Sequence, residues 1–434
     1  MVVEEVVLGR ARISFRLAAA GLAAALAALA AAGCAGSAVS TVEQLHQAVR
    51  AAKPGDEIVI APGTYRLLYT LRLSEPGVTL RGATGRRDDV VLVGGGMNVD
   101  RSPAEAVIIE ADDVTIRDLT LRDFWKHGLH IRAEADTDGT WIYNVKTVNI
   151  GERHVKGSMG WRGGYWTDDV VIERLHMLQT EPRGIRPGHP VSPEDYIGGI
   201  DVMRARNWVI RDCLAEGIRG ATGGGNAAIF IWNGVENVLI ERNRILGCCK
   251  GIALGNPSGP GAGQHHATGG IIRNNFILRS SGTDLNNIGL ELCNAKDVKV
   301  YHNTIYSQDA SYVRSVHLFD EAGEGLTTNV ELAYNIIRGQ IRDNTVAGLG
   351  AAAATSGWRS VGNLHGWMQD GRWHGTPIEA DWFVDPAKGD LHLTARAVPA
   401  IDQARPLAEV PEDIDGSRRP RGPYPDVGAD EYRP

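Results

Sequence analysis

The sequence is poor in cysteine and lysine, and it has no excess of positive charge. Five cysteines in 434 residues are too few for a disulfide-stabilised scaffold, and no CxxC pair suggests a zinc site. Lysine supplies only 8 of the 45 basic residues, and acidic residues outnumber basic ones by 7. The chain therefore lacks the basic face that a general nucleic-acid-binding protein needs. Its 53 glycines follow no Gly-X-Y period, which excludes collagen.

Long apolar runs are also scarce, and the longest lies near the N-terminus. Arg10, Arg12 and Arg16 precede an uncharged segment over residues 17–32. About 16 apolar residues are short for a membrane span of about 20 residues but fit the core of a signal peptide. We therefore predict a signal peptide over residues 1–33.

The residues that follow this segment indicate how the mature chain is attached. Ala32-Gly33-Cys34 resembles the bacterial lipobox, so Cys34 is predicted to be lipidated. Ala31 stands where that motif prefers leucine, and cleavage at a nearby alanine with free secretion is the alternative. Both interpretations place the mature protein outside the cytoplasm, on the bacterial cell envelope or in a secreted or periplasmic form. Contact with a membrane is then expected only through the lipid.

Residues 34–53 are predicted to form a linker and a short capping helix. Ser40 and Glu43 have the spacing of a capping box. Val42, Leu45 and Val49 then recur at helical intervals.

One short phrase of alternating apolar residues returns along the chain. It first reads Asp113-Val114-Thr115-Ile116-Arg117-Asp118-Leu119. The residues that close its copies are Leu119, Val145, Leu175, Cys213, Asn243, Asn275, Asn303, Asn335 and Asn363. A period of about 30 residues without helical segments predicts a solenoid of β coils.

The last five closing residues are all asparagine. Stacked coils place equivalent positions about 4.8 Å apart, so we expect the amides to hydrogen-bond to one another as a ladder. Asparagine also tolerates the left-handed backbone of a tight turn. An asparagine ladder beside a bend resembles the right-handed parallel β-helices of the pectin-lyase type, and the resemblance covers about residues 54–370. The predicted fold is thus all-β, a right-handed parallel β-helix preceded by a capping helix.

The tail over residues 371–434 differs in composition. Asp415-Gly416-Ser417-Arg418-Arg419-Pro420 is one of several segments that resemble the terminal part of many secreted bacterial β-helix proteins. Because an open solenoid end is an unpaired strand edge, we expect the tail to be a covering segment.

A further strand in each coil suggests a site. Where its aliphatic residues point inward, the residue between them points outward. The resulting outer column contains His130, Lys156, Asp201, Phe230, Ala253, Glu291 and His317, with Trp232 one pleat further on. Insertions at 150–167, 181–198, 219–226, 255–268 and 307–327 adjoin the same sheet and are expected to wall a groove.

Two sets of candidate residues follow from this arrangement. Those with catalytic chemistry are Lys156, Asp201, Glu291 and His317. Those expected to bind substrate, by stacking on sugar rings or by pairing with carboxylates, are His130, Trp161, Arg162, Arg186, His189, Trp232 and His265. For each residue, a structural role in a folded or solvated loop is the alternative.

The resemblance implies a substrate class but no catalytic motif. Segment 55–65 is similar to the opening coil of the chondroitinase B and alginate lyase group, yet we find no counterpart of that group's asparagine–glutamate–glutamate calcium site. The motifs of pectate lyases, epimerases and polygalacturonases are also missing. Even without a matching motif, the resemblance implies a lyase or epimerase acting on an acidic, uronic-acid polysaccharide. We expect the protein to be a monomer. A non-catalytic glycan-binding or surface-structural β-helix protein is the alternative.

The chemistry of elimination leaves the cofactor open. Either arginine or Ca²⁺ can neutralise the uronate carboxylate, and lysine, arginine, histidine or tyrosine can remove the C5 proton. Asp201 and Glu291 are expected three coils apart, about 14 Å, too far to share one Ca²⁺, whereas Glu291 and His317 are expected to be neighbours. The column has no adjacent acidic pair, which disfavours a glycosidase.

Overall fold

The computed structural model describes residues 38–159, 165–189, 192–256, 264–279, 288–312, 314–320, 326–345 and 359–434. The predicted signal peptide with Cys34, and the predicted substrate-binding residues Trp161 and Arg162, lie outside these ranges. Within them, no helix combines the length and the apolar character needed to cross a membrane.

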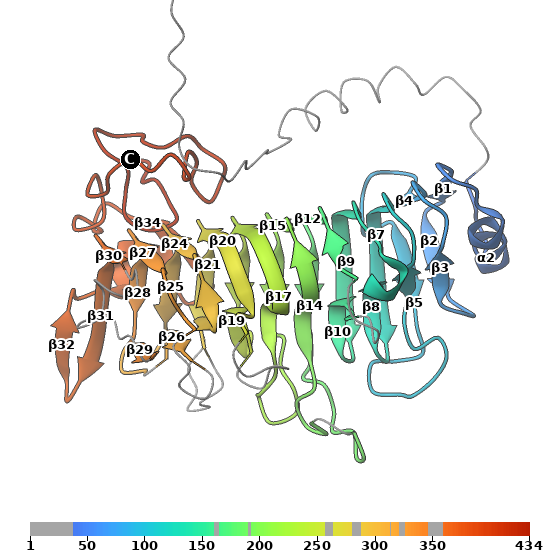
Figure 1. Ribbon diagram of the computed structural model, residues 1–434, viewed down its shortest axis with the longest axis horizontal. Coiled ribbons are helices and arrows are strands. Elements are labelled where there is room, and N and C mark those ends of the chain that lie inside the picture. The colour runs from blue at the N-terminus through green and yellow to red at the C-terminus, as the bar shows by residue number, and fades with distance from the viewer. Residues whose placement is uncertain are drawn as a thin grey trace, which may run out of the picture. The chain divides into compact units, whose positions relative to one another are not determined.

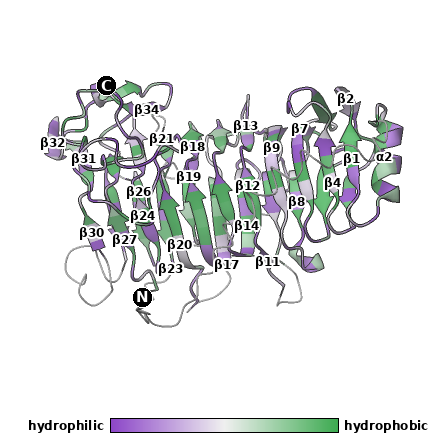
Figure 2. Cartoon of the chain, turned by 90° about the horizontal axis from the view of Figure 1, so that it is seen from above, coloured by the Kyte–Doolittle hydropathy of each residue, from purple (hydrophilic) through white to green (hydrophobic). Residues whose placement is uncertain are grey.

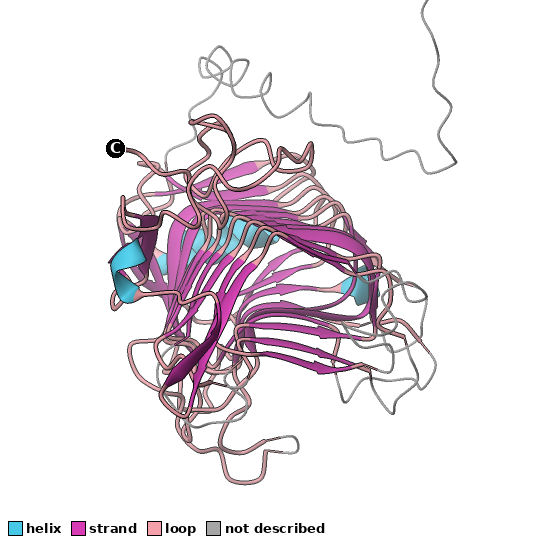
Figure 3. Ribbon diagram, turned by 90° about the vertical axis from the view of Figure 1, so that its left-hand side faces the viewer, coloured by secondary structure: helices cyan, strands magenta, loops and turns pink. Residues whose placement is uncertain are grey.

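From residue 39 onward the chain winds into a parallel β-solenoid, as predicted (Figure 1). Strands of successive coils stack into sheets that enclose a common interior (Figure 3). Each regular coil contributes to three sheets, whereas the sequence indicated two strands in each coil. The difference arises because the repeated phrase spans a bend: Val209–Arg211 and Leu214–Glu216 are separate strands on either side of Cys213.

The first sheet receives the opening strand of each phrase. It consists of β1 (Glu57–Ile60), β4 (Thr79–Gly82), β7 (Thr115–Phe124), β9 (Trp141–Ile150), β12 (Val171–Glu173), β15 (Val209–Arg211), the end of β17 (Ala227–Glu241), β20 (Ala267–Arg273), β24 (Lys299–Tyr301), β27 (Glu331–Ala333) and β30 (Arg359–Val361).

The second sheet follows the bend. It consists of β2 (Gly63–Arg66), β5 (Val90–Val93), the later parts of β7 and β9, β13 (His176–Leu178), β16 (Leu214–Glu216), β18 (Arg244–Leu246), β21 (Phe276–Arg279), β25 (Thr304–Ser307), β28 (Ile336–Arg338) and β31 (Leu364–Gln369).

The third sheet carries the predicted outer column. It consists of β3 (Leu71–Leu73), β6 (Val107–Ile109), β8 (His127–Ile131), β10 (Arg153–Gly157), β14 (Gly198–Arg206), the start of β17, β19 (Lys250–Leu254), β22 (Leu290–Cys293), β26 (Val316–Phe319) and β29 (Ile341–Asn344). The short strands β11 (Thr167–Asp168) and β23 (Ala295–Lys296) pair with the end of β14 and with β20.

The core lies between the sheets and is built from stacked aliphatic side chains. In the first sheet, Ile172 pairs in register with Ile210, Ile210 with Ile240, and Ile240 with Ile272. All four are buried. Figure 2 shows the hydrophobic segments repeating along the stacked strands. Alternation along each strand, together with a constant register between coils, therefore keeps one continuous core.

The asparagine ladder forms as predicted. Asn243 Nδ2 donates to Asn275 Oδ1 (3.0 Å), Asn275 Nδ2 to Asn303 Oδ1 (2.9 Å), and Asn303 Nδ2 to Asn335 Oδ1 (3.0 Å). Asn335 continues the series to Asn363 (2.8 Å). Each acceptor oxygen also receives the backbone N–H of the preceding ladder residue. The ladder thus satisfies both side-chain and backbone groups at the bend.

We expected the left-handed backbone conformation at the ladder asparagines, but it occurs one residue earlier in the chain. The residue before each closing residue has the positive φ, as in Arg242 (53°), Asn274 (53°) and His302 (50°). The asparagines do not appear among the positive-φ residues. Their selection for the ladder therefore follows from their amide hydrogen bonds.

The capping helix is α2 (Val42–Ala51), and its cap lies one residue later than predicted. Thr41 is the N-cap: its hydroxyl accepts from Gln44 N (3.2 Å), and Gln44 Oε1 accepts from Thr41 N (3.2 Å). This is a capping box formed with glutamine in place of glutamate. Leu45 packs into the core of the first coils.

The tail covers a flank of the last coils. After the antiparallel hairpin β31–β32 (Arg372–Gly375), it forms η3 (Ala380–Trp382) and the antiparallel pair β33 (Phe383–Asp385) and β34 (Asp390–Leu393). Its apolar residues join a second core with second-sheet residues such as Phe276 and Ile336. Buried Arg419 donates to Asn274 Oδ1 (3.2 Å). The contacts therefore lie along the side of the coils. The sequence analysis had instead predicted a cover for the open end of the solenoid.

Four of the five cysteines are described, and all four are buried: Cys213, Cys248, Cys249 and Cys293. Burial raises the pKa of Cys213 and of Cys248 to about 12. These cysteines pack the coils and carry no disulfide.

Candidate functional site

The outer column is one continuous register across the third sheet. Strand pairing places His130 beside Lys156 and Lys156 beside Asp201. The same register continues through Phe230, Ala253, Glu291 and His317. All four predicted catalytic residues therefore lie in one column, but Lys156 and His317 are five strand steps apart, about 24 Å.

Most of the column is covered. Asp201, Phe230, Ala253 and Glu291 are each at most 6% exposed. Phe230 and Ala253 pack with Ala227 and Trp232 in a small apolar cluster outside the main core, and the Phe230 and Trp232 rings stack at 5.4 Å. The more accessible side chains stand toward the ends, where His130 is 15%, Lys156 13% and His317 11% exposed. The column thus divides into two polar clusters with an apolar centre.

Asp201 is the centre of the first polar cluster. Its carboxylate accepts hydrogen bonds from Arg153 Nε, from Lys156 Nζ (3.2 Å) and from Trp232 Nε1 (3.1 Å). Burial opposes ionisation of Asp201, but Lys156 and Arg153 outweigh it and lower its pKa to about 2. Asp201 is therefore a carboxylate that fixes its neighbours, with little capacity to act as a base.

Lys156 is the group in this cluster that can exchange a proton. Burial lowers its pKa below the ordinary lysine value, and Asp201 opposes this effect. Lys156 and Arg153 lie three residues apart on β10, and both side chains reach the same carboxylate. Between them, His154 is fully buried and bonds Thr147 Oγ1 (2.7 Å). A lysine with a lowered pKa is a general-base candidate.

Glu152 joins the loop residues to this cluster. Its carboxylate accepts from Arg186 Nη1 (3.0 Å), and His189 Nε2 lies 3.7 Å away. Arg186 also donates to Met97 O (2.8 Å) and stacks on the Trp125 ring at 3.4 Å. Burial lowers the pKa of Arg186 to about 10. Two predicted substrate-binding residues, Arg186 and His189, are thus held on a carboxylate that the sequence analysis missed.

Arg183 is a buried cation in the same region. It is 0% exposed, and Nε, Nη1 and Nη2 all lack a hydrogen-bond partner within the described structure. Burial lowers the pKa of Arg183, and the negative charge of Glu152 partly opposes this effect. Tyr196 lies nearby, under the Arg153 guanidinium at 4.0 Å and against the His189 ring at 4.4 Å. The Arg183 guanidinium is therefore a buried donor that could take a carboxylate ligand.

The second polar cluster surrounds Glu291. Its Oε1 accepts from Lys250 Nζ (3.2 Å), and its Oε2 lies 3.5 Å from His317 Nδ1. Burial opposes ionisation, but His317 and Lys250 lower the pKa of Glu291 below its ordinary value. The predicted neighbours Glu291 and His317 are brought together, about 19 Å and about 24 Å along the column from Lys156.

His265 lies apart from the column. It lines a cavity of about 240 Å³ with Trp166, Arg204, Asn233, Gly234, Gln264 and His266. The structure therefore does not bring His265 together with Lys156 or Glu291.

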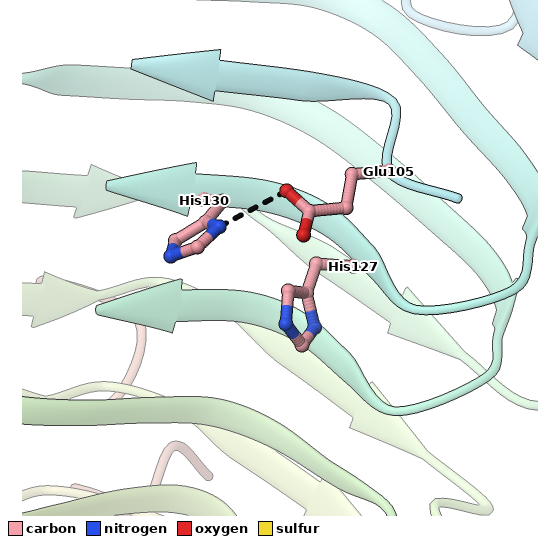
Figure 4. Close-up of side chains that lie close together, drawn as sticks. All are labelled: Glu105, His127 and His130. Atoms are coloured by element: carbon pink, nitrogen blue, oxygen red, sulfur yellow. Dashed lines mark hydrogen bonds and ion pairs between the residues drawn. The ribbon is translucent and has the colours of Figure 1, made fainter. Parts of the chain in front are cut away.

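A histidine pair beside Lys156 was only half identified from the sequence. His127 and His130 both lie on β8, with ring centroids 5.2 Å apart, and Glu105 precedes β6 on the adjoining coil (Figure 4). His130 Nδ1 lies 3.0 Å from Glu105 Oε2. One ligand-type atom from each of the three residues lies within 4.8 Å of the other two. The spacing of His127 and His130 around Gly128-Leu129 was the available signal.

A second cluster of histidine and carboxylate side chains lies in the tail, and its histidine is protonated. His392, Asp415 and Asp430 also come together, but both ring nitrogens of His392 face carboxylates, Nδ1 that of Asp390 and Nε2 that of Asp415 (3.3 Å). The hydrogen bond to Asp415 raises the pKa of His392 to about 9, with a further contribution from Asp390. The imidazolium has no lone pair for a metal.

Comparison with known proteins supports the fold. No protein-family model matches the chain, and no curated protein matches its sequence. The crystal structure of pectate lyase Pel9A is similar at 15% identity, with a TM-score of 0.51 over 89% of this chain and 90% of that one. This likeness confirms the predicted pectin-lyase-like parallel β-helix.

Two further solved structures are more distant. An alginate lyase from Paenibacillus sp. str. FPU-7 is 14% identical, with a TM-score of 0.47 over 75% of this chain and 97% of that one. A PL6 family polysaccharide lyase from Pseudopedobacter saltans is 12% identical, with a TM-score of 0.44 over 83% and 96%.

Proposed function

We propose that this chain is a carbohydrate-active β-helix protein, a lyase or epimerase that removes the C5 proton of a uronic-acid residue with Lys156 as the base. The observation that carries this proposal is the buried pairing of Lys156 with Asp201 near the buried Arg183, whose guanidinium has no hydrogen-bond partner among the described residues. The proteins to which the fold is similar include a pectate lyase, which agrees with this substrate class.

A buried cation next to the first polar cluster suits an acidic sugar. Arg186 donates to Glu152, whereas Nε, Nη1 and Nη2 of the buried Arg183 have no hydrogen-bond partner among the described residues. A buried guanidinium without hydrogen bonds is costly. A uronate carboxylate supplies the missing acceptor, and its neutralisation acidifies the C5 proton.

The reaction is a proton abstraction followed by one of two outcomes. In its unprotonated form, which the lowered pKa of Lys156 favours, Nζ takes the C5 proton, and Asp201 holds the amine in place. In a lyase, the electron pair forms the C4–C5 double bond, the C4–O4 bond breaks, and O4 receives a proton. Tyr196 is the candidate acid, because burial raises its pKa and keeps the phenol protonated. In an epimerase, C5 is reprotonated from the opposite face.

A glycan-binding protein without catalysis is the second candidate. Its support is that Asp201 and Glu291 are both buried and ion-paired, as expected of structural carboxylates. The apolar centre of the column, with Phe230 and Trp232 stacked, would then serve packing or sugar contact.

The test is a screen of purified protein against alginate, pectate, chondroitin and heparin, with and without Ca²⁺. A lyase gives an unsaturated product that absorbs in the ultraviolet, and an epimerase changes the uronate composition seen by NMR. Lys156→Ala should abolish either activity. Lys250→Ala is the matched control, because Lys250 makes the same 3.2 Å contact with a column carboxylate. Binding without turnover supports the second candidate, and neither binding nor turnover overturns both.

We also propose that the protein acts outside the cytoplasm, as a monomer anchored through lipid on Cys34 or secreted. The supporting observation is the basic, apolar and small-residue order of segment 1–34. An extracytoplasmic position gives access to a polysaccharide substrate.

A further inference from the structure

We propose that Glu105, His127 and His130 form a binding site for one divalent transition-metal ion, with Zn²⁺ as the reference ion. The proposal rests on the arrangement of these three side chains and does not depend on the proposed lyase or epimerase activity. Two imidazoles and one carboxylate are the donor set of many zinc sites that keep a fourth position open.

The backbone holds the three residues in place. Both neighbours of Glu105 are hydrogen-bonded to the start of β8: Lys126 N donates to Ala104 O (2.8 Å), and Ala106 N donates to His127 O (3.0 Å). The carbonyl of Glu105 itself accepts from Thr70 Oγ1 (2.9 Å). Glu105 is therefore fixed beside β8 although it lies in a connecting segment. A preorganised site of this kind does not have to order its ligands when the ion binds.

The distances fit a small ion with limited side-chain adjustment. Bonds of about 2.1 Å in a tetrahedral site place donor atoms about 3.4 Å apart. The separation of His130 Nδ1 from Glu105 Oε2, 3.0 Å, is near this value. The remaining separations are no larger than 4.8 Å, and the His127 and His130 rings meet at an interplanar angle of 81°. Rotation of the His127 ring, drawn below the other two side chains in Figure 4, would close the gap.

The histidines have unused hydrogen-bonding capacity. His127 is 8% exposed and its buried Nδ1 has no hydrogen-bond partner. Buried Nε2 of His130 also lacks a partner, but ligation through its Nδ1 would leave that nitrogen unpaired, so Nδ1 of His127 is the atom that an ion would satisfy. Unpaired buried polar atoms are uncommon and call for an explanation, for which an ion is one. His392 provides the contrast within the same chain, since carboxylates occupy both of its ring nitrogens.

A second carboxylate stands where an outer ligand would be needed. His127 Nε2 lies 4.0 Å from Glu152 Oε2. Metal-binding histidines commonly direct their second ring nitrogen toward a carboxylate, which orients the ring. Ligation through Nδ1 of His127 would leave Nε2–H facing Glu152. The donor set contains two nitrogens, and Ca²⁺ prefers oxygen ligands, so the site favours Zn²⁺ and similar ions.

The test measures metal binding directly on untagged protein that has been stripped with a chelator. Zn²⁺ is titrated in competition with a chromophoric chelator, and Co²⁺ is added separately to record its visible absorption. Wild type should bind one Zn²⁺ and give the Co²⁺ bands of a four-coordinate site. His130→Gln and Glu105→Gln should each weaken Zn²⁺ binding by roughly tenfold or more. Circular dichroism of each metal-free variant checks that it folds.

Two control variants locate the ion. His176→Gln removes a histidine that pairs with a single carboxylate, Glu216 at 2.6 Å, and should bind Zn²⁺ as wild type does. His392→Gln tests the other histidine–carboxylate group and should also have no effect. The proposal is overturned if wild type binds Zn²⁺ no more tightly than His130→Gln, or if His392→Gln is the variant that loses the ion.

Discussion

Lys156 Nζ donates a 3.2 Å hydrogen bond to Asp201 Oδ1, and the same carboxylate is also held by Arg153 and Trp232. The partners come from β10 and β17, the two strands that flank β14, on which Asp201 lies. Asp201 therefore compensates two buried cations at once, and its removal affects both stability and the position of the proposed base.

Asp201→Asn is expected to destabilise the protein strongly. The substitution leaves Arg153 and Lys156 buried without their counter-charge, which costs about 3–5 kcal/mol in comparable cases. The free energy of unfolding from urea denaturation measures the effect. Asp168→Asn is the control, because Asp168 pairs with a half-exposed Arg206 and should cost about 1 kcal/mol or less. Equal losses in the two variants would contradict the assigned role of Asp201.

Asn303→Leu should destabilise the middle coils. Asn303 donates to Asn335 Oδ1 and Ile272 O and accepts from Asn275, so leucine leaves several buried groups unpaired. Each costs roughly 1–3 kcal/mol, and thermal unfolding followed by circular dichroism should show a clear loss. Asn363→Leu, at the part-exposed end of the ladder, should lose less. An unchanged melting temperature for Asn303→Leu would count against the ladder.

The fold could be predicted because the same local sequence features recur along the chain. Alternation and period recur along the solenoid, and asparagine closes the last five copies, so the register of the outer column followed without knowledge of the sheets. Two details were missed because they depend on backbone geometry. The bend inside each phrase separates two sheets, and the positive φ falls one residue before each asparagine.

The site was harder to predict because it depends on contacts between unlike segments. Arg153 reaches Asp201 although the period-2 alternation of β10 would turn its side chain to the other face from Lys156, and Glu105 meets β8 from a connecting segment. Neither contact leaves a periodic signal. Parity indicated which residues leave the core, but it could not show that Phe230 and Ala253 would be covered.

Stability should fall as the pH rises from about 6.5 to about 9, because of His392. Its pKa is raised to about 9 in the folded protein, so the folded state keeps this proton after the unfolded chain has lost it. The contribution is complete below pH 6.5 and disappears above pH 9. Allowing for partial exposure, we expect roughly 2 kcal/mol. Urea denaturation in the presence of EDTA at several pH values measures it, and His392→Gln should flatten this part of the profile.

Lipidation of Cys34 predicts membrane fractionation. Wild-type protein should be recovered with membranes, and Cys34→Ser should release it or block processing, because the thiol is the only attachment point in the lipobox-like segment 32–34. Mass spectrometry of the mature N-terminus gives the independent measurement. Soluble wild-type protein that begins at a residue other than Cys34 would favour cleavage at a nearby alanine.

The last prediction separates the two polar clusters of the column. Lys156→Ala should abolish product formation, because no other described residue of the first cluster combines partial exposure with a lowered lysine pKa. His317→Ala should keep measurable activity, since His317 lies about 24 Å away along the sheet and pairs with Glu291. A lower affinity for long substrates, with turnover of short ones unchanged, would place His317 at the far end of the bound chain. Loss of activity in His317→Ala alone would instead assign the chemistry to the Glu291 cluster and leave Lys156 with a structural role.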